Sequence, residues 1–481
     1  MDQGAQHTTP APSSWVEIFR GRLGVYTVLI NFGILFFGID GFVLNTLMPT
    51  IVADIGGLAY YAWATMTFVV GAIIGSAGYG PLRGRLGGRK ALALGAAVFT
   101  VGALACSVAP HMAALLVARF FAGLGGGAIV AGSMSFTSAL YEPRLRTRAI
   151  AFTSVTWIGC ALIGPFIGGI FADLGWWRGA FWLYVPFAVT FLAGVWWKIP
   201  ESADRTTAAS RALRFPIWRL ACLGLGVMCV GAAGRVGSEW ERIALIAASI
   251  GICWYAFARD AKAKNRIFPS HPLSLSRPVG LGYWTLILVV AAYTAVSIYL
   301  PLVLTVLHGV PPLWVGAANA LMSSSWSIAA ALIAGLHGGA ERRAMLAGPI
   351  CLFAACAGFA AETHFAGGLV AVGALAILAG FGIGFINVHM QAKCMAAAEP
   401  GEESITASSL STVRSLGMAF GSAIGNTVSN MAGLVGVATY ETVQAAATGV
   451  YLFNLIPLAL AMFVVLRFFA VTSRPVALRA E

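Results

Sequence analysis

One acidic side chain, Asp40, lies deep inside a long apolar run of the sequence, residues 25–51. A charge at such a depth in a membrane-spanning segment costs at least about 2.5–3.5 kcal/mol, so an ionisable residue there indicates a function by default. A carboxyl group in apolar surroundings also takes up a proton more readily than one in water. We therefore expect Asp40 to carry a proton. The alternative is a structural Asp that hydrogen-bonds a neighbouring helix.

Arg119 is the expected partner of Asp40, and it lies in the apolar run 113–138. With a helical rise of 1.5 Å per residue, Asp40 lies roughly 16 Å and Arg119 roughly 9 Å from the ends of their runs that face the same side of a bilayer. The two side chains can therefore meet if their helices are neighbours. Protonation of Asp40 would then release Arg119 and give a proton-sensitive switch. A permanent structural ion pair is the alternative.

A ladder of polar residues, Asn387, His389, Gln391 and Lys393, closes the apolar run 366–396. The four-residue spacing places Asn387 with Gln391 on one helix face and His389 with Lys393 on another. The imidazole of His389 can titrate near neutral pH. A Lys near a helix end more often extends its amine to the lipid headgroups, which leaves a structural role open for both residues.

Further side chains within the apolar runs are candidates for a substrate pocket because they are aromatic or polar-tipped. They are Asn31, Asn45, Trp157, Tyr293, Tyr299, Asn319, Trp326, Asn387 and His389. An aromatic, mostly apolar cavity with one carboxylate suits lipophilic or cationic compounds. Intramembrane cations outnumber the one acid, however, which keeps an anionic substrate open. Interhelical packing is the alternative for each residue.

The sequence lacks the patterns of catalytic and metal sites. No Ser/His, His/Asp or Glu/His constellation has a useful spacing, and no Walker-type loop indicates an ATP-driven pump. The eight cysteines lie singly within apolar runs, without a CxxC pair. We therefore expect no enzyme, no cofactor and no metal. A membrane-embedded enzyme or a channel remains the alternative class to a transporter.

The elements that must position these residues are long apolar helices. The 481-residue chain is 59% hydrophobic and only 10% charged, whereas soluble domains carry roughly 25% charged residues. Runs of about 18 or more apolar residues are long enough to cross a bilayer as helices. We predict an all-α membrane protein of about fourteen spans. Their approximate ranges are 25–51, 62–82, 91–109, 113–138, 149–172, 180–198, 217–234, 241–258, 280–307, 312–336, 344–361, 366–396, 404–433 and 444–470.

The positive charge is a topology signal. Of the 30 Lys and Arg residues, 24 lie in alternate inter-span segments, which places both termini in the cytoplasm of a bacterial-type inner membrane. We therefore expect lipid contacts and no nucleic-acid partner, despite a net charge of +12. The polar first 24 residues and the long run after them do not resemble a cleaved signal peptide.

Two long polar connections, 199–216 and 259–279, divide the spans into six, two and six. The predicted organisation is a cytoplasmic N-terminal segment, a six-helix bundle, a linker with two extra spans, a second six-helix bundle and a cytoplasmic tail. The ranges are 1–24, 25–198, 199–279, 280–470 and 471–481. A faint repeat supports the division, because Arg89-Lys90-Ala91 returns as Arg342-Arg343-Ala344, and Gly164 with Gly168 returns as Gly421 with Gly425. Paired six-helix repeats with a site between them are a common transporter plan.

Several ordered motifs along nearly the whole chain resemble the fourteen-span drug:proton antiporters of the major facilitator superfamily. They are Ile39-Asp40-Gly41 with Leu47-Met48-Pro49-Thr50-Ile51, the loop Gly80 to Lys90, Arg119 with Gly123 and Gly125, Gly159 with Gly164-Pro165 and Gly168-Gly169, and Val413-Arg414 with Gly417. The resemblance implies two six-helix bundles plus two central helices (the major facilitator fold). It also implies that Arg119 influences proton coupling.

The resemblance further implies gating or conformational roles for the signature loop, the glycine motif of the span 149–172 and one cation. These residues are Gly80, Arg85, Gly87, Arg89, Lys90, Gly159, Gly164, Pro165, Gly168, Gly169 and Arg414. Small residues four apart also let helices pack closely in lipid, so simple packing explains the glycines equally well. The chain departs from the family where Gly84 replaces an Asp of the signature loop and Ala122 replaces a Gln. In the family this Asp helps to hold the cytoplasmic gate, and Gly84 has no carboxylate for such a contact.

The expected function is proton-coupled secondary active export of small lipophilic or cationic compounds by alternating access, that is, antiport. The proton gradient would supply the energy, and protons, lipids and a small-molecule substrate would be the partners of a monomer. Export of an endogenous metabolite, lipid or organic anion is the alternative. The export direction follows from the resemblance alone, because antiport and symport use the same parts.

Overall fold

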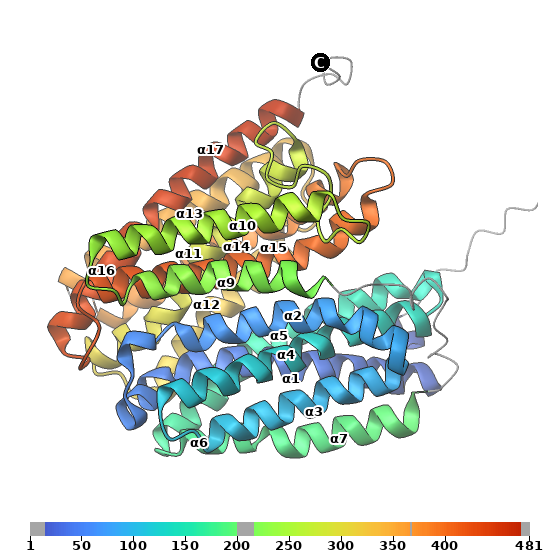
Figure 1. The fold of residues 1–481 in the computed structure, drawn as a ribbon, viewed down its shortest axis with the longest axis horizontal. Coiled ribbons are helices and arrows are strands. Elements are labelled where there is room, and N and C mark those ends of the chain that lie inside the picture. Colours follow the sequence, from blue (N-terminus) through green and yellow to red (C-terminus); the bar gives the residue numbers. More distant parts are fainter. Residues whose placement is uncertain (1–14, 200–215, 366–367, 473–481) are drawn as a thin grey trace, which may run out of the picture.

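The computed structural model of the chain describes residues 15–199, 216–365 and 368–472, which are helical and contain no strand (Figure 1). The first bundle holds α1 (Gly21–Ile55), α2 (Trp63–Leu86), α3 (Gly88–Ser107), α4 (Met112–Leu140), α5 (Pro143–Asp173), α6 (Trp177–Trp182) and α7 (Tyr184–Lys198). The central pair is α9 (Ile217–Ala233) and α10 (Glu239–Ala261). The second bundle holds α11 (Pro278–Val306), α12 (Pro312–Ile333), α13 (Gly338–Phe365), α14 (Gly368–Ala396), α15 (Glu403–Met431), α16 (Tyr440–Phe453) and α17 (Leu455–Thr472).

The predicted fold class is confirmed. Eleven helical segments of the described residues are long and apolar enough to cross a membrane. Three further helices do not meet that criterion: α9 has 17 residues, while α12 and α15 carry several Ser, Thr and Asn side chains that lower their hydropathy. Together they account for the fourteen spans expected from the sequence.

Two predicted spans, 180–198 and 444–470, are interrupted. Single residues, Leu183 and Asn454, separate α6 from α7 and α16 from α17. In each case a proline stands three residues later, at Pro186 and Pro457. Proline has no N–H to donate to the carbonyl four residues earlier, and its ring crowds that carbonyl, so the helix breaks at this point. The shared break makes the last span of each bundle alike.

The two bundles lie side by side, with α1–α7 in one half of the molecule and α11–α17 in the other (Figure 1). Helix α5 packs against α12, and α2 packs against α15, so these two pairs join the bundles. The central pair lies along one side, where α9 contacts both α2 and α15.

A buried ion pair fixes the central pair of helices. Arg219 at the start of α9 contacts Asp260 in the last turn of α10, and each side chain is at most 4% exposed. Asp260 also accepts hydrogen bonds from the backbone N–H groups of Ile267 and Phe268, and Arg219 donates to Asn265. The same pair therefore holds the start of the connection to α11 against the two helices.

The connection before α11 is also tied to the second bundle. Glu402, just before α15, accepts hydrogen bonds from the backbone and hydroxyl of Ser270 at 2.8 and 2.7 Å, and it pairs with Arg266 at 2.9 Å. Burial alone would raise the pKa of Glu402, but the bonds from Ser270 and the charge of Arg266 outweigh it and hold this pKa below its usual range. The Glu402 carboxylate therefore stays ionised at neutral pH, and its contacts persist.

Replacing Asp260 with Asn is expected to destabilise the protein by about 3–5 kcal/mol, because Arg219 would be left buried without a counterion. Replacing Glu239 with Gln on the same helix is the control. Glu239 pairs with Arg242 and is itself 74% exposed, so about 0–1 kcal/mol is expected. Thermal unfolding in detergent compares the two variants, and an equal shift in melting temperature would contradict the assigned role of Asp260.

Parts of the sequence-based organisation fall outside the described residues. These are most of the N-terminal segment 1–24, nearly all of the connection 199–216 and most of the tail 471–481. The domain boundaries therefore stay a prediction.

Candidate functional site

Asp40 and Arg119 meet inside the first bundle. Arg119 Nη1 donates to Asp40 Oδ2 at 2.6 Å, and both side chains are at most 1% exposed. The guanidinium lies over the Phe68 ring, 4.0 Å from its centre, and Nε points to the Ala64 carbonyl at 3.5 Å. Helices α1, α2 and α4 therefore position the pair, as the matching depths in the sequence allowed. Its role in proton coupling stays a prediction.

The contact between these two side chains uses one atom of each. Asp40 Oδ1 and Arg119 Nη2 are buried and make no hydrogen bond of standard geometry. Tyr184 of α7 and Cys106 of α3 are buried beside the pair. Oδ1 thus has lone pairs available for a proton while Oδ2 still contacts Arg119. Such a carboxylate can bind a proton and, once neutral, release its ion-pair partner.

The two bundles touch at one end, where the α1–α2 and α11–α12 connections lie; we name it the α1–α2 end. Asn45 Nδ2 donates to Ser297 Oγ of α11 at 3.3 Å and accepts from Thr65 at 3.1 Å. The Tyr61 and Tyr299 rings lie 5.7 Å apart across the bundles. Asn45 and Tyr299, predicted as pocket residues, therefore take part in contacts between the bundles.

The glycine motif of α5 serves two contacts. Gly164 and Gly168 lie against the α1 backbone, where an added Cβ would come within 3.3 Å of the Ile39 carbonyl oxygen and 2.8 Å of the Val43 carbonyl oxygen. Gly169 lies against Leu313 of α12.

Pro165 extends the second of these contacts. A Cβ on Gly316 of α12 would come within 2.3 Å of the Pro165 carbonyl oxygen. The close approach of α5 and α12 thus depends on residues without side chains. Gly159, in contrast, faces open space.

The signature loop between α2 and α3 lies at the opposite end of the first bundle. Gly87 has φ +87°, a conformation that favours glycine, and it ends α2 so that α3 can begin at once. Arg89 lies over the Trp196 ring, 4.6 Å from its centre, and donates to the Trp196 carbonyl. Arg85 and Lys90 are exposed, and Gly80 meets nothing within 4 Å. Gly84 is buried and offers no carboxylate.

The remaining predicted pocket residues divide between the bundles. Asn31 donates to the Thr27 carbonyl and accepts from Thr156, within the first bundle. Trp157 is 38% exposed and touches Phe37 edge-on. In the second bundle Tyr293 and Trp326 pack together, as do Arg414 and Trp326. Their role in substrate binding stays a prediction.

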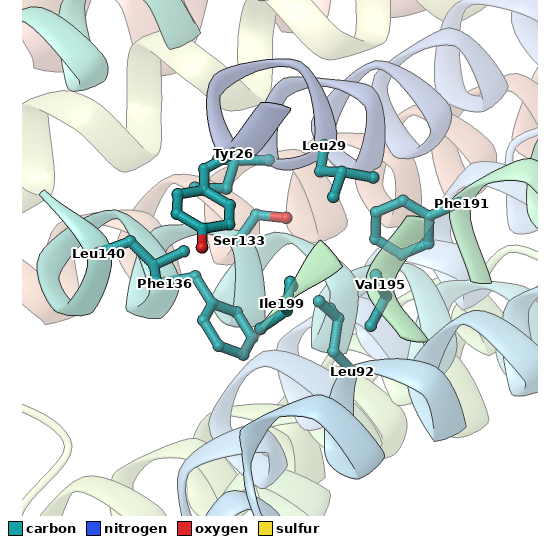
Figure 2. A pocket seen from close by; sticks show the side chains of 10 residues that line it. Tyr26, Leu29, Leu92, Ser133, Phe136, Leu140, Phe191, Val195 and Ile199 are labelled. Atoms are coloured by element: carbon teal, nitrogen blue, oxygen red, sulfur yellow. The ribbon is translucent and has the colours of Figure 1, made fainter. Parts of the chain in front are cut away.

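A small cavity lies between α1, α3, α4 and α7, and Figure 2 shows the side chains around it. Its lining is apolar apart from the Tyr26 and Ser133 hydroxyls. None of the predicted site residues lines it. We regard it as a packing gap inside the first bundle.

Buried acids also lie in the last turns of two described helices, Asp260 in α10 and Glu362 in α13. Glu362 is 5% exposed and pairs with His308 at 3.1 Å. The prediction ended this span at residue 361, whereas α13 continues to Phe365 and carries Glu362 within its last turn. An acid placed one residue beyond a predicted boundary should have counted as a possible intramembrane residue.

His389 and Lys393 share an acidic partner that sequence reasoning missed. Glu341, in the first turn of α13, lies 3.4 Å from His389 Nδ1 and 3.0 Å from Lys393 Nζ. His389 Nε2 also lies 2.9 Å from the Ile333 carbonyl oxygen. His389 therefore joins the ends of α12, α13 and α14. On the neighbouring face of α14, the side-chain amide of Gln391 donates a hydrogen bond to the backbone carbonyl of Asn387, one turn earlier.

Comparison with known proteins identifies the family. The sequence profile of the Major Facilitator Superfamily matches residues 30–422. A Mycobacterium tuberculosis protein named a "probable multidrug-efflux transporter" is 28% identical over 435 residues, which cover 88% of this chain and 91% of that protein. "Multidrug resistance protein 3" of Bacillus subtilis is 24% identical over 404 residues, covering 82% and 77%.

Solved structures support the fold. A peptide transporter aligns with a TM-score of 0.65 at 16% identity, covering 93% of this chain and 95% of that chain. A xylose transporter of E. coli aligns with a TM-score of 0.57 at 13% identity, covering 91% and 98%.

Proposed function

This chain belongs to the major facilitator superfamily, and on that premise we propose that it is a proton-coupled antiporter that exports small lipophilic compounds. It is a multi-pass membrane transporter and not an enzyme. The observation that carries the proposal is the buried Asp40–Arg119 pair, because each side chain keeps one polar atom without a hydrogen bond of standard geometry. The relatives named for drug efflux support the export direction.

The proposed orientation places the α1–α2 end outside the cell and both termini in the cytoplasm, since basic residues gather in the other set of connections. With this orientation the bundles touch at the outer end, through Asn45, Ser297, Gly169 and Leu313. The structure then corresponds to a state closed to the outside. A second state, closed at the cytoplasmic end, completes alternating access.

The coupling step follows from the pair. A proton from outside binds Asp40, which weakens its contact with Arg119, and the freed guanidinium favours the other arrangement of α1, α2 and α4. Release of the proton to the cytoplasm restores the ion pair. The proton and the substrate can shift the equilibrium between the two states only as far as each binds one state more tightly than the other. The transporter would work as a monomer in a bacterial inner membrane.

Reconstitution into liposomes tests the proposal. With an acidic lumen, molecules inserted with the cytoplasmic face outward should concentrate a transported dye inside, and a protonophore should abolish the concentration. Equilibration without concentration indicates a channel and contradicts the proposal. Equal uptake with and without the pH gradient contradicts proton coupling.

A further inference from the structure

Resting on the proposed function, we propose that Arg414 binds an acidic group of the transported compound, next to the aromatic pair Trp326 and Tyr293 in the second bundle. The substrate class is then an aromatic or lipophilic compound that carries a carboxylate or a similar anion. This deepens the function by assigning a charge to the substrate.

Arg414 lies 11 residues into α15, roughly 16 Å along the helix from its first residue. Within the described part of the chain, no acidic side chain pairs with it, whereas Arg119, Arg219 and Arg266 each pair with a carboxylate. Its Nε is buried and has no hydrogen-bond partner. A guanidinium at this depth without an anion is costly, and an anion from outside the chain would remove that cost.

The aromatic surroundings of Arg414 come from α12 and α11, and α11 packs against both α15 and α12. The Arg414 guanidinium lies 5.7 Å from the centre of the Trp326 ring of α12, and Trp326 meets Tyr293 of α11 edge-on at 5.3 Å. Helix α12 also packs on α14 and α5. The Arg414 and Trp326 side chains therefore meet over the face of α11. A ligand that reaches this face can contact both side chains.

A second, independent observation marks the same face of α12. Asn319, Ser323 and Trp326 follow a four- and three-residue spacing, so they share one side of the helix. The Asn319 side chain is 4% exposed, and its Oδ1 is buried without a hydrogen-bond partner. One turn beyond Tyr293 on α11, Ser297 contacts Asn45 of the first bundle. The group thus lies just inside the contact between the bundles.

The donor set indicates an anion. A guanidinium binds carboxylate, sulfonate or phosphate oxygens through paired N–H groups, and an indole or phenol ring offers a flat surface to an aromatic body. The sequence left a cationic substrate open because Asp40 could attract it. In the structure Asp40 is paired with Arg119, Glu341 with Lys393, and Glu362 with His308. Each of these carboxylates already has a basic partner, whereas Arg414 has no acidic one among the described residues, so an anion is the class that fits.

Two dyes of one ring framework test the assignment by direct binding. Fluorescein carries a carboxylate, whereas rhodamine 123 carries a cationic xanthene and an ester. We expect purified protein to bind fluorescein, and Arg414→Gln to weaken this binding about 10-fold or more, with rhodamine 123 binding unchanged. Arg414→Lys should retain part of the affinity, since it keeps the charge. Trp326→Ala should weaken fluorescein binding without removing the charge.

Arg235→Gln is the matched control, because Arg235 also lies over an aromatic ring, that of Tyr60 at 4.1 Å, but in a connection outside the spans. Its fluorescein affinity should equal that of the wild type. Monodisperse elution and an unchanged melting temperature establish that each variant is folded. The proposal is overturned if fluorescein does not bind the wild type, or if it binds Arg414→Gln with wild-type affinity.

The binding experiment separates this inference from the function on which it rests. If fluorescein binds through Arg414 and no pH gradient drives its transport, proton coupling fails and the acid site stands. If a pH gradient drives rhodamine 123 transport and Arg414→Gln leaves all dye binding unchanged, the acid site fails and the antiporter stands.

Discussion

Asp40→Asn is expected to reduce pH-driven accumulation of substrate to the level of protein-free liposomes. The amide keeps the size of the side chain and can still contact Arg119, but it has no proton to bind or release at neutral pH. The same change leaves the Arg119 charge without a counterion inside the first bundle. Breaking a buried pair in this way costs about 3–5 kcal/mol of stability, so the variant should also melt at a lower temperature.

Asp54→Asn is the matched control, because Asp54 lies near the end of the same helix and its side chain is 47% exposed. It should retain pH-driven accumulation. Exchange of labelled for unlabelled substrate without a gradient separates lost coupling from lost folding. Asp40→Asn should keep this exchange, since binding and alternating access do not need the proton gradient. Wild-type accumulation by Asp40→Asn would contradict the role of the pair.

Gly316→Ala is expected to prevent full closure of the α1–α2 end. Its Cβ would lie 2.3 Å from the Pro165 carbonyl oxygen, and backbone on both sides must separate to admit it. Overpacking of this kind costs about 1–3 kcal/mol, and each 1.4 kcal/mol changes an equilibrium constant about tenfold. The closed state should therefore lose about one to two orders of magnitude in population relative to the open one.

The measurement uses a Cys at Leu313 in a background without other cysteines, with a membrane-impermeant maleimide added from the outside. Gly316→Ala should speed labelling about tenfold or more, because the outer end opens more often. Gly159→Ala in the facing helix is the control, since Gly159 meets nothing within 4 Å. Equal labelling rates in the two variants would contradict a closing contact between α5 and α12.

The helices and the contact between Asp40 and Arg119 could be predicted from the sequence for physical reasons. Run length determines which segments can span a bilayer, and depth along two helices allowed Asp40 and Arg119 to meet. The breaks at Leu183 and Asn454 could have been found from Pro186 and Pro457, but a run scored by hydropathy does not register a missing N–H.

Other features depend on which helices become neighbours, and one sequence does not give this. Glu341 meets His389 and Lys393 only because α13 packs on α14. Asn45 meets Ser297 across 252 residues of the chain, so its polar tip joins the two bundles. Arg414 and Arg119 are the same residue type and each lies over an aromatic ring, but among the described residues only Arg119 also meets a carboxylate.

The central claim is that substrate movement and proton movement are coupled through Asp40. A pH-sensitive dye trapped inside proteoliposomes reports this directly when substrate is added outside, with no gradient imposed. The account predicts that substrate entering the lumen drives protons out, so that the lumen becomes alkaline for the wild type and for Asp54→Asn, and does not change for Asp40→Asn. Substrate uptake by the wild type with no change in internal pH would contradict it.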